Sequence, residues 1–312
     1  MRSIFALLLL SLVVLCLLEM TPGLRGADAS TSTRFAAAEK ILHDARVSMG
    51  MPGVAVAVVE NGKIVWTFSD GMADLENNIP VTPHTVFRIA SVSKTMAAMA
   101  TMQVVEKGLV KLDEPIWTYV PWYPRKGNAV ITVRHLLTHT SGIRHYHYEL
   151  GEKESMQFYA SVEEGSKIYG VDQEPLQFTP GTHYLYSTFG YALLAGIVEK
   201  ATGITFEAYM HEHLWAPAGM SVTKMEHPDE IIPYRAHAYR KEAKAGQVIN
   251  APYIDVSYKW AAGGVISTVE DLAHYVIALH DGRLLKSGTL EQVYTPYILA
   301  DGKSTGYGIG WH

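Results

Sequence analysis

The segment from Thr95 to Lys107 constrains the fold of this chain most, because it is apolar on nearly every side up to its last turn. A helix with this pattern cannot lie on a surface and must be buried in the middle of the protein. Gly108 follows as a suitable C-terminal stop. The chain has 312 residues, 48% of them hydrophobic, so it supplies enough apolar surface to surround such a helix.

The residues around this segment predict both helices and strands. Residues 34–48 carry apolar residues at helical spacing and predict an amphipathic helix. Two strand-like runs follow at 54–59 and 63–68, joined by Asn61-Gly62, which is a strong hairpin signal. Further along, the patterns predict helices at 133–137, 191–201 and 269–279, the last capped by Thr268, and strands at 265–267 and 307–311.

These elements predict an α+β fold. Helix and hairpin elements occur near both ends of the chain, and the middle is mainly helical. Such an order favours an antiparallel sheet flanked by helices, together with a mostly helical region. We expect the active site where the two regions meet.

The N-terminus is typical of an export signal. Arg2 precedes an apolar run from Ile4 to Leu18, and small residues follow from Gly26 to Ser30. The run is shorter than the roughly 20 residues of a spanning helix. We therefore expect a signal peptide at residues 1–27, a hydrolase domain at 28–312, and a periplasmic or secreted protein. An uncleaved membrane anchor is the alternative, and the single cysteine, Cys16, lies within this apolar run.

Charge and histidine spacing exclude several classes of partner. The formal net charge is −5 and basic runs are absent, so we expect no nucleic-acid binding. Three histidine pairs have short spacings, but none completes a known zinc motif, so we expect no metal: His135/His139, His145/His147 and His211/His213. The expected partner is a small-molecule or peptide substrate, and no cofactor is expected.

Ser91 and Lys94 are the candidate reactive pair. A serine hydroxyl needs a neighbouring base, and a lysine three residues later on a helix lies on the same face. If the helix is buried, desolvation lowers the pKa of the lysine, which can then accept a proton. A helix cap at Ser91 and a solvated lysine remain the structural alternative. Ser221 and Lys224 repeat the spacing, but they do not open an apolar helix, and we predict a turn there.

Several motifs together resemble the serine β-lactamase and penicillin-binding superfamily, in its class C-related branch. The resemblance covers roughly residues 35–311, and within the branch it is most similar to the group of the animal mitochondrial serine β-lactamase-like protein and its bacterial relatives. The motifs that carry it are Ser91-Val92-Ser93-Lys94, Tyr186-Ser187-Thr188, the run 131–142, Pro180-Gly181 and the run 262–268 with Asp271-Leu272.

The resemblance implies a role for each motif residue. Ser91 would be the acylated nucleophile and Lys94 its base, while Tyr186 would protonate the leaving group and later activate water. Thr188 would be a substrate-binding residue, standing where most of the family has asparagine. The threonine keeps an acceptor but lacks the amide donor that grips a substrate carbonyl. Peptides, D-peptides or esters are therefore expected as substrates in preference to efficient β-lactam hydrolysis.

The C-terminal part departs from the family pattern. The family has a third motif on a strand after the one that resembles Tyr307–Trp311, and the sequence reaches His312 before that motif. We therefore expect a C-terminally truncated domain that lacks an oxyanion donor. The alternative to a hydrolase is a catalytically weak or inactive scaffold with the same fold.

Overall fold

The computed structural model describes residues 31–146, 156–242 and 246–312. The expected signal peptide at residues 1–27 lies outside the described residues. Within the described part of the chain, no helix has the length and apolar character needed to cross a membrane.

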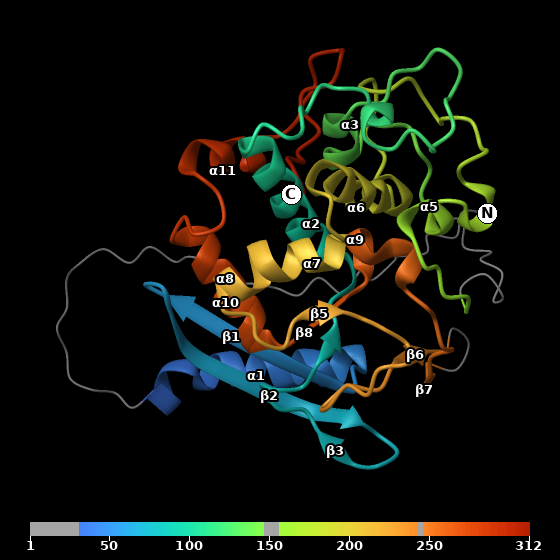
Figure 1. The fold of residues 1–312 in the computed structure, drawn as a ribbon. Coiled ribbons are helices and arrows are strands. Elements are labelled where there is room, and N and C mark those ends of the chain that lie inside the picture. Colours follow the sequence, from blue (N-terminus) through green and yellow to red (C-terminus); the bar gives the residue numbers. More distant parts are fainter. Residues whose placement is uncertain (1–30, 147–155, 243–245) are drawn as a thin grey trace.

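A helix and a hairpin form one side of the molecule. Helix α1 (Thr31–Met49) packs along strand β2 (Lys63–Asp74), which pairs with β1 (Gly53–Glu60) in antiparallel register and with the short β3 (Ile79–Pro80) (Figure 1). Asn61 and Gly62 join the two long strands with positive φ values of 49° and 70°. These values fit the two-residue turn that matches strand twist, so the predicted hairpin is confirmed.

A second small sheet leads into the centre of the molecule. Its middle strand β8 (Val265–Ser267) pairs with β4 (Phe87–Arg88) on one side and β5 (Lys224–Met225) on the other, both antiparallel. A two-stranded ribbon of β6 (Tyr239–Lys241) and β7 (Val248–Asn250) lies apart from it. The predicted strand at 265–267 is confirmed, and it positions the chain just before the reactive helix.

Helix α2 (Ser93–Glu106) is the predicted central helix. Eleven of its 14 residues are buried, including Met96, Met99 and Met102 at 0% exposure. It contacts α6 (Thr188–Thr202) and α9 (Trp260–Gly263), and Figure 1 shows it enclosed by later helices. The apolar character on every side of the helix is therefore explained by neighbours on every side.

The remaining helical segments surround this centre. Helix α10 (Val269–His280) is capped by the Thr268 side chain, which accepts from the Asp271 N–H, and it packs on β1. The other α-helices are α3 (Val133–Leu137), α5 (Val162–Gly165), α7 (Phe206–Met210), α8 (Ala216–Ala218) and α11 (Ser287–Tyr294). The single-turn and irregular segments are η1 (Ala90–Val92), η2 (Ile116–Thr118), η3 (Ile168–Gly170), η4 (His211–Trp215) and η5 (Ser257–Lys259). The α+β prediction is confirmed.

The strand predicted at Tyr307–Trp311 is wrong. The segment forms a turn in which the Gly308 N–H donates to the Trp311 carbonyl at 2.8 Å. Gly310 has a φ of 80°, a left-handed value incompatible with a strand. An added Cβ at Gly310 would come within 2.7 Å of the Ala98 Cβ, so the glycine lets this turn lie directly on α2. Close approach to α2, and not sheet pairing, explains the glycine-rich pattern.

Candidate active site

The chain reverses sharply between β4 and α2, and this turn presents Ser91. Ala90 has a φ of 45°, and the short η1 segment follows before α2 begins at Ser93. The Ser93 hydroxyl donates to the Ala90 carbonyl at 2.7 Å and accepts from the Val265 N–H at 3.2 Å. The turn is therefore fastened both to itself and to the central strand β8.

Lys94 lies beside Ser91. Its Nζ is 3.2 Å from the Ser91 Oγ, and the two side chains lie one turn apart as the spacing indicates. The Lys94 ammonium also donates to the Ala262 carbonyl at 2.6 Å and to the Thr188 hydroxyl at 3.3 Å. All three acceptors are uncharged, so no carboxylate among the described residues holds Lys94 in its protonated form.

Burial controls the protonation of Lys94. The side chain is only 1% exposed, and its pKa lies well below the usual range because the charged form is desolvated. The positive charge of Lys259 lowers the pKa further. A neutral amine next to a serine hydroxyl can take up its proton. The solvated-lysine alternative is therefore contradicted by the buried position of this side chain.

Tyr186 completes the group on the far side of Ser91. Burial raises the pKa of Tyr186, while a hydrogen bond with Ser91 acts in the opposite direction. The Lys94 Nζ lies 4.9 Å from the centre of the Tyr186 ring. With a raised pKa, the phenol keeps its proton at neutral pH and can donate it to a group held next to Ser91.

Thr188 is the first residue of α6, and it is 3% exposed. The helix is capped by the Ser187 hydroxyl, which accepts from the Gly190 N–H at 2.9 Å. The Thr188 hydroxyl accepts from Lys94, and its N–H donates to His145 Nδ1 at 3.2 Å. The structure thus brings together all four residues selected from the sequence: Ser91, Lys94, Tyr186 and Thr188.

Two histidines also belong to this group, although the sequence analysis considered them only as metal ligands. His139 Nδ1 accepts from the Ser187 N–H at 3.1 Å, and its ring lies 4.3 Å from that of Tyr186 between centres. Burial holds the pKa of His139 well below 6.5. Burial, together with Lys94 and Lys259, lowers the pKa of His145 to about 4. Both rings are therefore neutral acceptors at neutral pH, and both position the start of α6.

His135 and His139, which were paired by their spacing, have different structural roles: His135 caps α3, and His139 contacts the start of α6. His135 Nδ1 accepts from the Thr132 N–H at 3.2 Å and completes the capping box of α3. In the parts of the chain that the structure describes, no three His, Cys, Asp or Glu side chains gather in a way that could hold a metal ion. The signal that could have identified His139 and His145 is position: His139 lies inside the motif run 131–142, and His145 lies three residues after Gly142, which ends that run.

The second Ser-x-x-Lys spacing is structural. The N–H groups of Val222 and Thr223 both donate to Asp271 Oδ2 at 2.8 Å, and strand β5 begins at Lys224. Lys224 forms an ion pair with Glu230 at the surface. Ser221 is therefore in a bend that leads into a strand, in agreement with the predicted turn.

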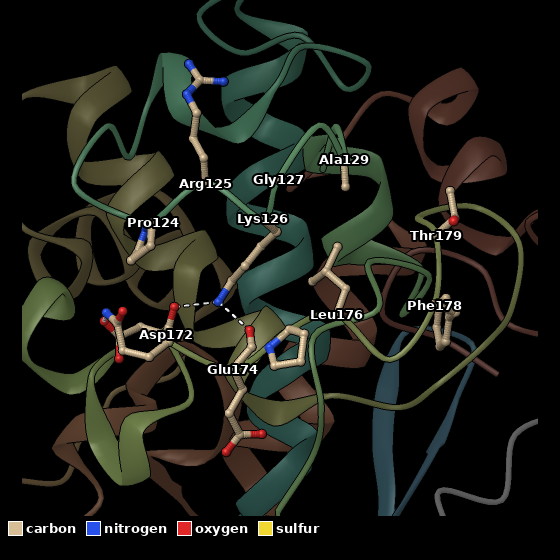
Figure 2. A pocket seen from close by; sticks show the side chains of 12 residues that line it. Pro124, Arg125, Lys126, Gly127, Ala129, Asp172, Glu174, Leu176, Phe178 and Thr179 are labelled. Carbon is tan, nitrogen blue, oxygen red and sulfur yellow. Dashed lines mark hydrogen bonds between the residues drawn. The ribbon is translucent and has the colours of Figure 1, made fainter.

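A surface cavity of about 630 Å³ lies away from these residues (Figure 2). It is lined by two loops, and Lys126 joins them by donating to the carbonyls of Asp172 and Glu174. None of Ser91, Lys94, Tyr186 and Thr188 lines this cavity. Its size therefore does not make it the reactive site, which is defined by the side chains around Ser91.

Comparison with known proteins identifies a family and several relatives. A family model described as beta-lactamase matches residues 38–312. The mitochondrial serine beta-lactamase-like protein LACTB of Homo sapiens is 33% identical over 299 residues, covering 75% of this chain and 54% of the relative. This chain therefore spans about half the length of that relative.

Two solved structures are also similar. The octameric penicillin-binding protein homologue from Pyrococcus abyssi superposes with a TM-score of 0.74 at 27% identity, covering 88% of this chain and 64% of that one. D-amino acid amidase from Ochrobactrum anthropi SV3, complexed with D-phenylalanine, gives a TM-score of 0.70 at 29% identity, covering 83% and 74%.

Proposed function

The chain belongs to the beta-lactamase family, and from this premise we propose that it is a serine hydrolase that cleaves an amide or ester through a covalent acyl-enzyme. The observation that carries the proposal is the buried Lys94 amine, 3.2 Å from the Ser91 hydroxyl and without a carboxylate partner among the described residues. A structural lysine would instead be expected to pair its charge or to reach solvent.

The proposed acylation begins at Ser91. Its Oγ attacks the carbonyl carbon of the substrate while its proton moves to the neutral Lys94 amine. The tetrahedral intermediate collapses, the carbon–leaving-group bond breaks, and the leaving group takes a proton through Tyr186. Water then attacks the ester bond to Ser91 with the same groups acting in reverse, and the free acid leaves. The start of α2 supplies a positive dipole end for the developing oxyanion.

The proposed substrates are peptides, D-amino-acid amides or esters in preference to β-lactams. Thr188 offers a hydroxyl but no amide donor for a substrate carbonyl, and that hydroxyl already contacts Lys94. The similarity to D-amino acid amidase, at 29% identity, supports an amide as one substrate class.

A fluorophosphonate probe tests this function directly. We expect a single adduct on the intact protein by mass spectrometry, absent from Ser91→Ala, while Ser221→Ala labels like the wild type. Ser221 is the matched control because it has the same spacing to a lysine but lies in a bend. Labelling that persists in Ser91→Ala would refute the assignment of the nucleophile.

The second candidate function is a binding scaffold with the same fold, and Thr188 favours it because the amide donor for substrate is missing. A scaffold need not react with the probe. Folded wild-type protein that acquires no adduct would therefore support the scaffold and refute the hydrolase.

The N-terminal pattern supports one further proposal, that residues 1–27 direct export. Expression of the whole chain in a bacterial host, followed by N-terminal sequencing of the exported protein, tests it. A mature protein that begins near Asp28 is the expected result, and retention in the cytoplasm would refute it.

A further inference from the structure

A second lysine lies next to the candidate site. Lys259 ends η5, immediately before α9, and its aliphatic chain runs over Gly263, where an added Cβ would be 3.4 Å from the Lys259 Cδ. The neighbouring residue Ala262 provides the carbonyl that accepts from Lys94. The two lysines therefore reach the same short turn of chain from two different elements.

Aromatic contacts connect Lys259 to the substrate-binding position. Its Nζ lies 5.2 Å from the centre of the Tyr258 ring and 5.7 Å from that of Tyr146, both within the range of cation–π attraction. The Tyr146 hydroxyl accepts from Tyr258 at 3.2 Å and is also hydrogen-bonded to Thr188. Lys259 thus touches the ring whose hydroxyl reaches Thr188.

No carboxylate neutralises Lys259 within the residues that the structure describes. Two acids of the surrounding network, Asp255 and Glu226, have other partners. Asp255 accepts from the backbone N–H and hydroxyl of Ser257. Glu226 forms ion pairs with Arg88 and Arg235. The charged group that acts on Lys259 is Arg88, and it is positive.

Such an ammonium is poised to bind an anion. Burial lowers the pKa of Lys259 to about 8, with a smaller contribution from Arg88. The side chain therefore remains mainly protonated at pH 7. A partly buried cation without a counter-ion is unfavourable, and an incoming carboxylate would both pair its charge and accept a hydrogen bond.

We propose that Lys259 binds a carboxylate of the substrate, so that the site prefers acyl compounds with a negative charge near the scissile bond. This inference rests on the proposed hydrolase function. It identifies a specificity residue outside the Ser-x-x-Lys and Tyr-Ser-Thr motifs.

Two matched esters provide the test. The 4-nitrophenyl monoester of adipic acid carries a free carboxylate, and methyl 4-nitrophenyl adipate has the same chain with that charge capped. For the wild-type chain, we expect kcat/KM for the charged ester to exceed that for the capped ester by roughly 10- to 100-fold, the value of one charge-assisted hydrogen bond.

Three variants localise the effect. Lys259→Met should lose the preference, so that its kcat/KM values for the charged and the capped ester become nearly equal. Lys259→Arg should keep the preference because it keeps the charge. Lys200→Met, which removes an exposed lysine near the end of α6, is the control and should behave like the wild type.

The outcomes separate this inference from the proposed function. A wild-type protein that labels at Ser91 but hydrolyses both esters equally would overturn the role of Lys259 and leave the hydrolase intact. A preference that survives in Lys259→Met would overturn it as well. If Ser91 does not label, the hydrolase function fails and the inference fails with it.

Discussion

One basic side chain on the hairpin side, Arg46, and one on the helical side, Lys94, have opposite surroundings. Beside the hairpin, Arg46 in α1 pairs with Asp70 in β2 at 2.5 Å, and the pairing lowers the pKa of Asp70. In the helical side, Lys94 is almost fully buried and contacts only uncharged acceptors. Paired charges fasten one element to another, whereas the unpaired buried amine becomes neutral and reactive.

The two sides of the molecule also differ in how deeply their residues are buried. Every residue of β1 is half-buried, although the run 54–59 within it is continuously apolar. Most of α2 is fully buried. The hairpin lies at the edge of the molecule and α2 at its centre (Figure 1). The difference indicates that a reactive lysine needs the centre, where neighbours exclude water from every direction.

The largest expected effect comes from replacing Lys94, and replacing Arg46 provides the comparison. Lys94→Met should slow acylation of Ser91 by on the order of 10²–10⁴-fold, because the proton acceptor is lost. Its free energy of unfolding should stay equal or rise, since folding no longer has to remove a proton from a lysine in order to bury it. The rate of fluorophosphonate labelling and urea unfolding measure the two quantities.

Arg46→Met is the counterpart on the hairpin side. It should label at the wild-type rate and lose about 1 kcal/mol of stability, because Asp70 loses Arg46 and keeps only its contact with His43. If Lys94→Met labels at the wild-type rate, or if Arg46→Met labels slowly, the contrast between a reactive Lys94 and a structural Arg46 is wrong.

Cavity-forming substitutions should follow the difference in burial. Met99→Ala in α2 should lower the free energy of unfolding by about 2–5 kcal/mol, because a fully buried side chain leaves a cavity. Val56→Ala in β1 should cost about 1 kcal/mol, because its side chain is only partly buried. Equal losses in urea unfolding would contradict the division into a buried centre and an open edge.

The pH dependence of stability should come partly from His145. Its folded pKa of about 4 lies below the ordinary value of 6.5, so the unfolded chain binds the proton first as the pH falls. Stability contributed by the neutral ring is therefore present above pH 6.5 and lost between pH 6.5 and 4.

His145→Gln should show a smaller loss of stability than the wild type between pH 7 and pH 4.5, since it has no proton to bind. His280→Gln, exposed at the end of α10, is the matched control and should lose as much as the wild type. Urea unfolding at the two pH values measures both, and identical losses in all three proteins would refute the role of His145.

The smallest expected effect is at Thr188. Thr188→Asn adds an amide donor to the site, and acylation of Ser91 by a penicillin should rise about 2- to 10-fold, the value of one hydrogen bond. Thr202→Asn, at the other end of α6, is the control and should leave the rate unchanged. A penicillin rate that falls in Thr188→Asn would indicate that the threonine hydroxyl matters more for holding Lys94 than an amide does for substrate.

Much of the local structure could be predicted from the sequence. The hairpin at Asn61-Gly62, the buried helix after Ser91 and the cap at Thr268 each depend on residues close together in the chain. The turn at Tyr307–Trp311 could not be predicted in this way. Its alternating pattern resembles a strand, and only the contact between Gly310 and Ala98 explains the glycine.

The same distinction applies to the candidate site: contacts between residues close in the chain could be predicted, and contacts between distant residues could not. Spacing alone places Lys94 beside Ser91, because both lie within one helical turn. The parts played by His139 and His145 depend on hydrogen bonds to Ser187 and Thr188, which are 48 and 43 positions away in the chain. The part played by Lys259 depends on aromatic rings and on burial by other elements. By itself the sequence determined the family, the buried helix and the reactive pair. Only the tertiary structure decided which charges stay unpaired, because desolvation is set by neighbours that are distant in the chain.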